Sequence, residues 1–250
     1  MNNPMKFMLS VDELTPSQLY ISEEKLRAVR EWFDGDITKM DPIPVKKLAG
    51  RLLITDGHTR AVAALLSGAD ILPCLWDTDD MDWAAYAADI TMCAEEGITS
   101  VRRLAERIVS AEDYEILWHK RCDELYDEWY YKVLKQDDEV IFFTRQPVEV
   151  GECDIRPLDL GYDDAEYFLL YLDGVPAARG CIERYSFEFW EAADIRTEKK
   201  FRNRGCGYQI TAYLTNLIVK AGKTATCRTL PENIGMNRVI QKCGYAKLYE

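Results

Sequence analysis

The chain has 250 residues, of which 48% are apolar and 30% are charged, and this composition is typical of a globular protein with a large core. Its net charge of −12 disfavours non-specific binding to nucleic acid. No segment has the apolar length of a membrane span or a signal peptide, and the eight isolated cysteines include no CxxC pair, so we expect a cytoplasmic protein without a metal site or a disulfide scaffold.

The first eighty residues predict a small α/β domain. Ser22 is a suitable N-cap for the first helix because two acidic residues follow it. Glycine and proline separate the later apolar runs, which therefore predict short strands and one apolar helix. The expected elements are a helix at 22–32, strands at 43–47 and 52–55, a helix at 61–66 and an extended segment at 71–76.

The segment ITDGHTRAVAALLSGADILP, at 54–73, resembles the ParB N-terminal and sulfiredoxin-like fold. In that fold a strand, a short turn with a terminal arginine and a helix form a nucleotide phosphate site. The resemblance therefore implies a second anion site at Gly57, His58, Thr59 and Arg60. His58 occupies the position of the nucleophilic cysteine of sulfiredoxins, which argues against sulfiredoxin chemistry. The second arginine and the DNA-reading module of ParB proteins are not evident.

Two side chains in this turn each have two interpretations. His58 is either a general base or phosphate ligand, or it fixes the turn by hydrogen bonding. Arg60 either binds an anion at the helix N-terminus or forms a salt bridge with Asp56. The sequence alone leaves both pairs of alternatives open.

Residues 81–136 are acidic and helical in pattern, and we expect them to connect two domains. From residue 139 onward the pattern predicts strands at 140–144, 166–172, 177–183 and 187–197, with a hairpin turn at Asp173 and Gly174. The expected fold class is α+β, with a mixed, mostly antiparallel sheet flanked by helices after residue 136. The expected domains are 1–80, a connector at 81–136, and 137–250.

The hexapeptide RNRGCG, Arg202–Gly207, lies between the last of these strands and a helix expected over 208–221. A glycine-rich turn that opens a helix leaves backbone N–H groups free, and together with the helix dipole they favour a bound phosphate. Gly205 and Gly207 allow the backbone to approach such an anion closely. The order of residues fits neither GxxxxGK[ST] nor GxGxxG.

A second segment, NIGMNRVIQKCGY at 233–245, predicts a helix with Asn233 as its N-cap and Gly244 at its end. Together the two segments resemble the [QR]-x-x-G-x-[GA] loop and the later N-x₈-K-x-G-[FY] segment of the GNAT N-acetyltransferases. The resemblance covers about residues 138–250. Residues 196–250 carry 11 Lys and Arg against 3 Asp and Glu, and this charge of +8 suits an anionic donor such as coenzyme A or an acidic partner segment.

The resemblance implies acetyl-CoA as the acyl donor. It implies backbone contacts from Ile195 and Thr197 to the pantetheine and thioester, and a contact from Asn233 to the pantetheine amides. It implies a pyrophosphate site made by Arg202, Asn203, Arg204, Gly205, Cys206, Gly207 and Tyr208. We interpret Cys206 as a small spacer and not as a nucleophile.

For catalysis, the family often has a base about eleven residues before the loop, and Glu191 is at that position. Its apolar neighbours Trp190 and Ala192 favour proton acceptance near neutral pH, although Glu191 could equally be an ordinary exposed acid. Ile240 replaces the tyrosine that often protonates the leaving thiolate, so either Tyr208, Tyr213 or solvent takes that role, or the thiolate leaves without a proton donor.

The sequence therefore predicts an acetyl-CoA-dependent N-acetyltransferase that transfers an acetyl group to a primary amine by direct attack. The alternative is a nucleotide- or CoA-sensing protein with a degenerate GNAT domain. The acceptor is a small-molecule or protein amine, and the acidic remainder of the chain, with a charge of −20, favours a cationic one. We expect no membrane partner, and a homodimer stays open.

Overall fold

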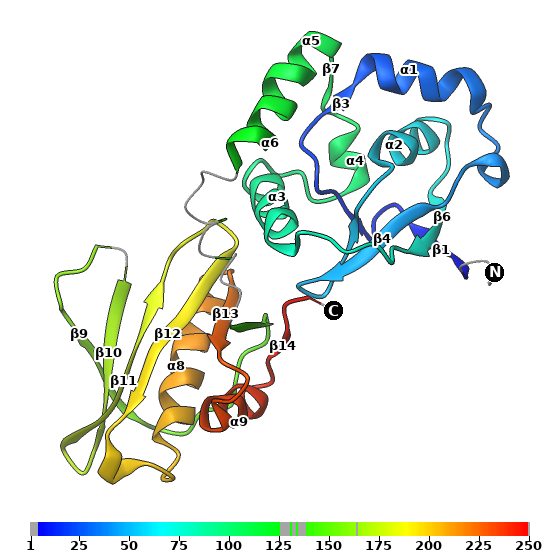
Figure 1. Ribbon diagram of the computed structural model, residues 1–250. Helices are drawn as coiled ribbons and strands as arrows, with labels where there is room; N and C mark the ends of the chain where they lie inside the picture. Colours follow the sequence, from blue (N-terminus) through cyan, green and yellow to red (C-terminus); the bar gives the residue numbers. More distant parts are fainter. Residues whose placement is uncertain (1–4, 126–130, 132–133, 135–138, 164, 250) are drawn as a thin grey trace. The chain divides into compact units, whose positions relative to one another are not determined.

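The computed structural model describes residues 5–125, 131, 134, 139–163 and 165–249 (Figure 1). Contacts divide the chain into two compact units, one of residues 1–135 with 249–250 and one of residues 136–248. No helix in the described residues is both long and apolar enough to cross a membrane.

The first unit contains a five-stranded sheet in the order β1-β6-β4-β5-β2 and a two-stranded sheet of β3 and β7. Its strands are β1 (Lys6–Ser10), β2 (Leu14–Thr15), β3 (Ile21–Ser22), β4 (Ile43–Leu48), β5 (Arg51–Ile54), β6 (Ile71–Trp76) and β7 (Ile108–Val109). Its helices are α1 (Glu23–Trp32), α2 (His58–Leu66), α3 (Trp83–Glu95), α4 (Val101–Leu104), α5 (Ala111–Tyr114) and α6 (Lys120–Leu125), with a 3₁₀ turn at Ile37–Lys39 and a π-helical turn at Glu115–His119.

The helices after residue 80 belong to the same core as the sheet, which differs from the connector expected from the sequence. Ala88, Met92 and Cys93 of α3 are buried together with Val45 of β4 and Ala61 of α2. The small side chains of α2 and α3 allow close packing, so a helix that looks like a linker in sequence contributes to the core here. Tyr249 also belongs to this unit, where its ring stacks on Trp83 at 4.5 Å.

The second unit contains a seven-stranded sheet in the order β14-β8-β13-β12-β11-β10-β9. Its strands are β8 (Val140–Thr144), β9 (Asp154–Leu158), β10 (Ala165–Leu172), β11 (Val175–Glu183), β12 (Phe189–Thr197), β13 (Thr224–Thr229) and β14 (Ala246–Lys247). Only β12 and β13 pair in parallel, and the other neighbours are antiparallel. The expectation of a mixed, mostly antiparallel sheet is therefore confirmed.

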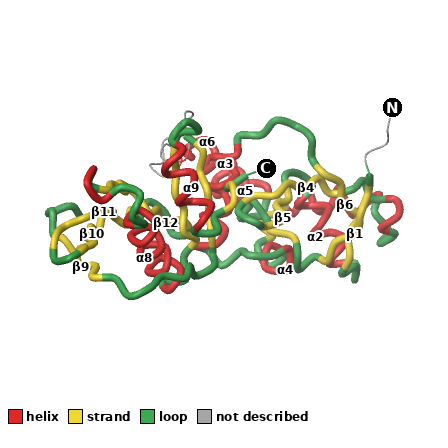
Figure 2. The backbone as a smooth tube through the Cα atoms, turned by 90° about the horizontal axis from the view of Figure 1, so that it is seen from below, coloured by secondary structure: helices red, strands yellow, loops and turns green. Residues whose placement is uncertain are grey.

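Two helices, α8 (Cys206–Lys220) and α9 (Ile234–Lys242), flank this sheet (Figures 1 and 2). α8 contacts β10, β11, β12 and β13, and α9 contacts α8 and β13. The apolar face of α8 is buried at Ile210, Leu214 and Ile218, and Ile240 of α9 is buried in the same core. Burial of each such side chain stabilises the fold by about 1.5–3 kcal/mol, so α8 is firmly attached to the sheet.

Candidate functional site

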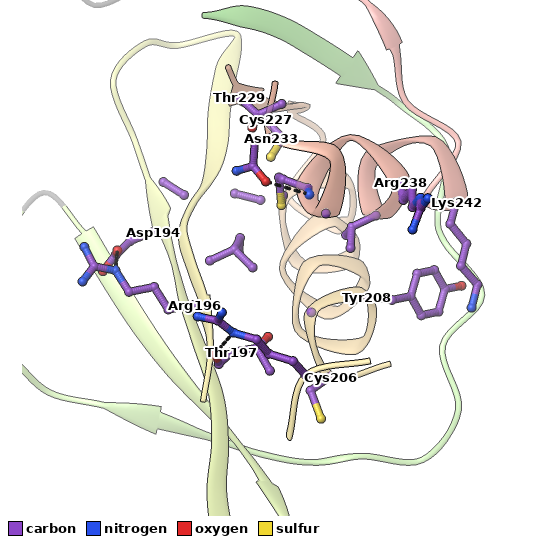
Figure 3. Close-up of a pocket in the computed structure, with 18 of the residues that line it drawn as sticks. Asp194, Arg196, Thr197, Cys206, Tyr208, Cys227, Thr229, Asn233, Arg238 and Lys242 are labelled. Carbon is purple, nitrogen blue, oxygen red and sulfur yellow. Dashed lines mark hydrogen bonds and ion pairs between the residues drawn. The ribbon is translucent and has the colours of Figure 1, made fainter. Parts of the chain in front are cut away.

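A cavity of about 1050 Å³ opens where the two parallel strands separate (Figure 3). β12 and β13 pair from Phe189 with Thr224 as far as Glu191 with Thr226, and the pairing then stops. The rest of β12, from Ala192 onward, therefore faces the cavity along one edge. β13, the N-terminus of α8 and the exposed side of α9 form the other walls. Strand edges present unpaired N–H and C=O groups, so this edge suits an extended polar ligand.

A β-bulge bends β12 beside the cavity. Cys181 pairs with Ala193 and Arg179 with Arg196, so β12 has one residue more than β11 over this stretch. Asp194 takes up the extra length with a φ of +47°. Its carboxylate accepts a hydrogen bond from Arg196 Nε at 2.8 Å and forms an ion pair with Arg179 Nη2 at 3.0 Å. The bulge sets the direction of the strand that carries Ile195 and Thr197.

The N-terminus of α8 forms one wall of the cavity. Gly205 precedes the helix with a φ of +83°, and no side chain caps the helix. The N–H groups of the first helical turn have no acceptor within the helix, so they are available to an anion. A Cβ atom on Gly207 would lie 3.4 Å from Thr197 Oγ1, which shows how closely the turn approaches β12.

Most residues of the predicted pyrophosphate loop line this cavity. Arg202, Asn203, Gly205, Cys206, Gly207 and Tyr208 all do so. Arg204 is not part of the lining, and its guanidinium lies 5.7 Å from the ring centroid of Phe201. The side chain of Arg202 turns back to β12, where Nε donates to the carbonyl oxygen of Thr197 at 3.4 Å.

The remaining predicted donor-binding residues, Ile195, Thr197 and Asn233, also line the cavity. Asn233 caps α9, as predicted, because its Oδ1 accepts the N–H of Met236 at 3.2 Å. The capping bond leaves its amide nitrogen directed away from the helix toward the cavity (Figure 3). Asn233 therefore presents a donor there, which is what a ligand carbonyl requires.

Glu191 lies at the point where the strands separate, and it is only 3% exposed. Arg228 of β13 donates to both of its oxygens, at 2.8 Å from Nε to Oε1 and 2.8 Å from Nη2 to Oε2. Glu191 is therefore not an ordinary exposed acid, contrary to one of the two interpretations from the sequence.

The side chains that the sequence analysis considered as proton donors, and Cys206 as a spacer, lie at different positions relative to the cavity. Ile240 is fully buried, so it offers nothing to the cavity. Tyr213 packs edge-on against Phe168 and does not line the cavity, whereas Tyr208 does, with its hydroxyl donating to the carbonyl oxygen of Glu149. Partial desolvation raises the pKa of Tyr208. Cys206 is 1% exposed and packs in the core of the second unit.

The second predicted anion site, in the first unit, has its charged groups engaged. His58 is buried, and its Nε2 accepts the N–H of Ser17 at 3.0 Å, so a neutral ring carries its proton on Nδ1. Burial lowers the pKa of His58 to about 4. Arg60 donates to the carboxylate of Asp56 at 3.0 Å and to the carbonyl oxygen of Asp41 at 3.0 Å. These contacts correspond to the turn-fixing interpretation of His58 and the salt-bridge interpretation of Arg60, while Gly57 and Thr59 form the start of α2.

Several cavity residues were given no role from the sequence, among them Arg228, Arg238 and Lys242, although Lys242 is the lysine of the N-x₈-K-x-G-[FY] segment. Arg228 is two residues beyond Thr226 on β13, so the two side chains project from the same face, and only the strand register places Arg228 beside Glu191. Arg238 and Lys242 are one helical turn apart on α9, and this spacing was the available signal for a cationic face.

Comparison with known proteins gives one family match. Residues 175–250 match the model of the FR47-like proteins. The matched segment contains the cavity walls from β11 to α9. No curated protein matches the chain.

Several solved structures are similar to part of the chain. A putative acetyltransferase of the GNAT family from Novosphingobium aromaticivorans is 14% identical with a TM-score of 0.39, over 44% of this chain and 59% of that one. A GCN5-related N-acetyltransferase from Kribbella flavida is 19% identical with a TM-score of 0.38, over 48% of this chain and 60% of that one. A GNAT family acetyltransferase from Elizabethkingia anophelis with acetyl-CoA bound is 21% identical with a TM-score of 0.31, over 36% of this chain and 73% of that one.

The chain thus spans about six tenths of the length of the first two of these structures. At this level of similarity the function has to be argued from the residues of the chain itself.

Proposed function

We propose that the protein is an acetyl-CoA-dependent N-acetyltransferase that transfers an acetyl group from the thioester to a primary amine. The observation that carries the proposal is the cavity in which the free edge of β12 meets the uncapped N-terminus of α8. One wall offers backbone groups for an extended amide chain, and the other offers N–H groups for a pyrophosphate. Coenzyme A has both of these parts in that order.

The residues fit this donor in three places. The first-turn N–H groups of α8 bind the pyrophosphate, and Arg202 supplies positive charge beside them. The edge of β12 at Ile195 and Thr197 binds the pantetheine amides, with the amide nitrogen of Asn233 opposite. Gly205 also lines the cavity, and nothing lies within 4 Å of the position that a Cβ atom would take there, so the turn leaves room for the ligand at this residue.

When bound there, the thioester supplies the acyl group, which passes to the amine nitrogen as the C–S bond breaks. The attacking amine loses one proton, and the departing thiolate takes one up. We propose Glu191 as the proton acceptor, because it is the carboxylate at the point where the strands separate. Tyr208 lines the cavity at the pyrophosphate loop, and its hydroxyl donates to the carbonyl oxygen of Glu149, so we propose solvent as the source of the proton for the thiolate.

A second candidate function is binding of coenzyme A without catalysis of acetyl transfer. Two observations favour it: Arg228 engages both oxygens of Glu191, and Ile240 is buried where a proton donor is often found. This candidate predicts binding of acetyl-CoA without release of free thiol in the presence of any amine. The first candidate predicts both binding and release.

The decisive measurement combines calorimetric titration with acetyl-CoA and an assay of free thiol across small amines, polyamines and lysine peptides. Gly207→Glu is the blocking variant, because its side chain enters the cavity and its carboxylate opposes a phosphate. A carboxylate in the first turn of a helix is compatible with the helix dipole, so the fold is retained. We expect affinity to fall at least a hundredfold.

Gly207→Ala is the matched control. Its Cβ makes an ordinary contact of 3.4 Å with Thr197 Oγ1, so affinity changes by only a few-fold. Equal titration curves for the wild type and Gly207→Glu, or no binding by the wild type at micromolar concentrations, would contradict the proposal.

The family match covers none of residues 10–76, so the resemblance of this segment to the ParB and sulfiredoxin-like fold stays a prediction. We propose that the first unit binds the acceptor or regulates the second unit. The chemical class of the acceptor remains a primary amine, small or protein-bound, with a cationic one favoured by the acidic residues outside 196–250.

A further inference from the structure

Two cations on α9 line the cavity without an acidic partner among the described residues. Arg238 and Lys242 are four residues apart, so they project from the same side of the helix. Both are exposed, and no ion pair in the described residues includes either of them. The ammonium of Lys242 lies 4.0 Å from the centroid of the Tyr208 ring, and Figure 3 shows the lysine side chain extending past that ring.

This arrangement is not required by the fold. Like charges four residues apart destabilise a helix slightly. The C-terminal position of Lys242 benefits from the helix dipole, but Arg238 lies mid-helix and gains less. The neighbouring Asn237 has the structural role, because its Nδ2 donates to the carbonyl oxygens of Leu230, at 3.2 Å, and Asn233, at 2.9 Å.

The two cations belong to α9 and not to the turn that opens α8. Tyr208 follows Gly207 in the helix, and the aromatic ring lies next to Lys242 on the α9 side of the loop. The acids that line the cavity belong to β12, to its continuation or to the residue before β8, and none is on α9: they are Glu139, Glu191, Asp194 and Glu198. Arg196, Lys199, Arg202 and Arg228 also line the cavity, but on the walls that carry these acids, whereas an anionic group on the α9 wall meets no carboxylate of α9.

We propose that Arg238 and Lys242 bind the 3′-phosphate of coenzyme A, so that the protein selects 3′-phosphorylated donors over 3′-dephospho-CoA and over phosphopantetheine carried on a protein. This inference rests on the proposed function. Coenzyme A has two anionic centres, the pyrophosphate and the 3′-phosphate, on either side of a ribose. The N-terminus of α8 accounts for the first centre and the α9 cations for the second, and charge-assisted bonds from arginine and lysine to phosphate are among the stronger polar contacts.

The test is a calorimetric comparison of coenzyme A with 3′-dephospho-CoA, using the full chain and the variants Arg238→Gln, Lys242→Gln and the double variant. The wild type is expected to bind coenzyme A at least about tenfold more tightly than 3′-dephospho-CoA. The double variant is expected to bind both equally, with the affinity that the wild type has for 3′-dephospho-CoA. Lys220→Gln removes one charge from the exposed end of α8, outside the cavity, and is the control that should keep the preference.

The outcomes separate the two proposals. If the wild type binds both ligands equally, or if the double variant weakens both by the same factor, the 3′-phosphate assignment is wrong while the proposed donor site stands. If the wild type binds neither ligand, the proposed function fails and the assignment fails with it. Thermal denaturation of each variant checks the fold, and since both residues are exposed we expect melting temperatures close to the wild type.

Discussion

Glu191 and Arg228 form a buried ion pair at the centre of the second unit. Their side chains are 5% and 10% exposed, and Tyr185 is buried beside them with its hydroxyl 2.7 Å from Thr226 Oγ1. Replacing one member of such a pair leaves the other charge buried without compensation. The pair therefore links the chemistry proposed for Glu191 to the stability of the sheet, and the two effects need to be measured separately.

Glu191→Gln is expected to lower the free energy of unfolding by about 3 kcal/mol, because it removes the buried charge to which Arg228 donates at both oxygens. As the proposed base, Glu191 also contributes on the order of a hundredfold to the rate of thiol release. Kinetics at a temperature where the variant is folded should show that rate loss while the dissociation constant for acetyl-CoA stays unchanged.

The control for this experiment is Glu183→Gln. Glu183 pairs in register with Glu191 on β11 but does not line the cavity, so the rate should stay within a few-fold of the wild type. A Glu191→Gln variant that is destabilised but retains the full rate would assign the carboxylate a structural role only.

At the scale of elements, the parts of the site that lie close together in the sequence could be predicted, whereas the parts that depend on pairing between strands could not. The turn RNRGCG, the helix after it and the Asn233 cap all follow from residues within a few positions of each other, and the structure has them as expected. The bulge at Asp194 depends on a positive φ in a non-glycine residue and on contacts with Arg179, for which the sequence has no local pattern. The same holds for Arg228, which only the register of β13 brings to Glu191.

Gly180 allows the bulge to form. A Cβ atom there would lie 2.6 Å from Ile195 Cδ1 and 2.8 Å from Leu214 Cδ1. Gly180→Ala should therefore displace Ile195 and destabilise the protein by about 1–3 kcal/mol in urea unfolding. Gly151→Ala is the matched control, since nothing lies within 4 Å of the added atom. A Gly180→Ala protein as stable as the Gly151→Ala protein would show that the bulge has room that the structure does not indicate.

For the whole molecule, the sequence separated an N-terminal α/β part from a C-terminal sheet, but it did not reveal that the helices after residue 80 share the core of the first unit. Small residues at helical spacing, such as Ala84, Ala87 and Ala88, give only a weak signal of an apolar helix face. Their burial depends on the surface of the first unit against which α3 packs. The first unit also contains the ionisable groups His58 and Asp89. His58 is kept neutral, and Asp89 of α3 has a buried Oδ1 with no hydrogen-bond partner among the described residues.

His58 and Asp89 make the stability of the protein depend on pH in opposite directions. Burial lowers the pKa of His58 from 6.5 to about 4, so its contribution to stability is present above pH 6.5 and is lost as the pH falls toward 4. Burial raises the pKa of Asp89 from 3.8 to about 8, so its contribution is present below pH 3.8 and is lost as the pH rises toward 8. Between pH 4 and 6.5 the unfolded chain gains a proton at His58 and loses one at Asp89, and the two slopes cancel.

Asp89→Asn should remove the pH dependence of stability that Asp89 causes and leave the pH dependence that His58 causes. The difference in unfolding free energy between variant and wild type is then expected to change by about 1.4 kcal/mol per pH unit between pH 4 and 8, with the variant relatively more stable at the higher pH. Between pH 6.5 and 8 the buried carboxyl of Asp89 makes the wild type lose stability as the pH rises, and the variant lacks this contribution. Urea unfolding of the full chain at pH 5, 6, 7 and 8 measures this difference directly, and groups common to both proteins cancel. A difference independent of pH would mean that Asp89 is ionised in the folded protein, and that water or a side chain satisfies its carboxylate.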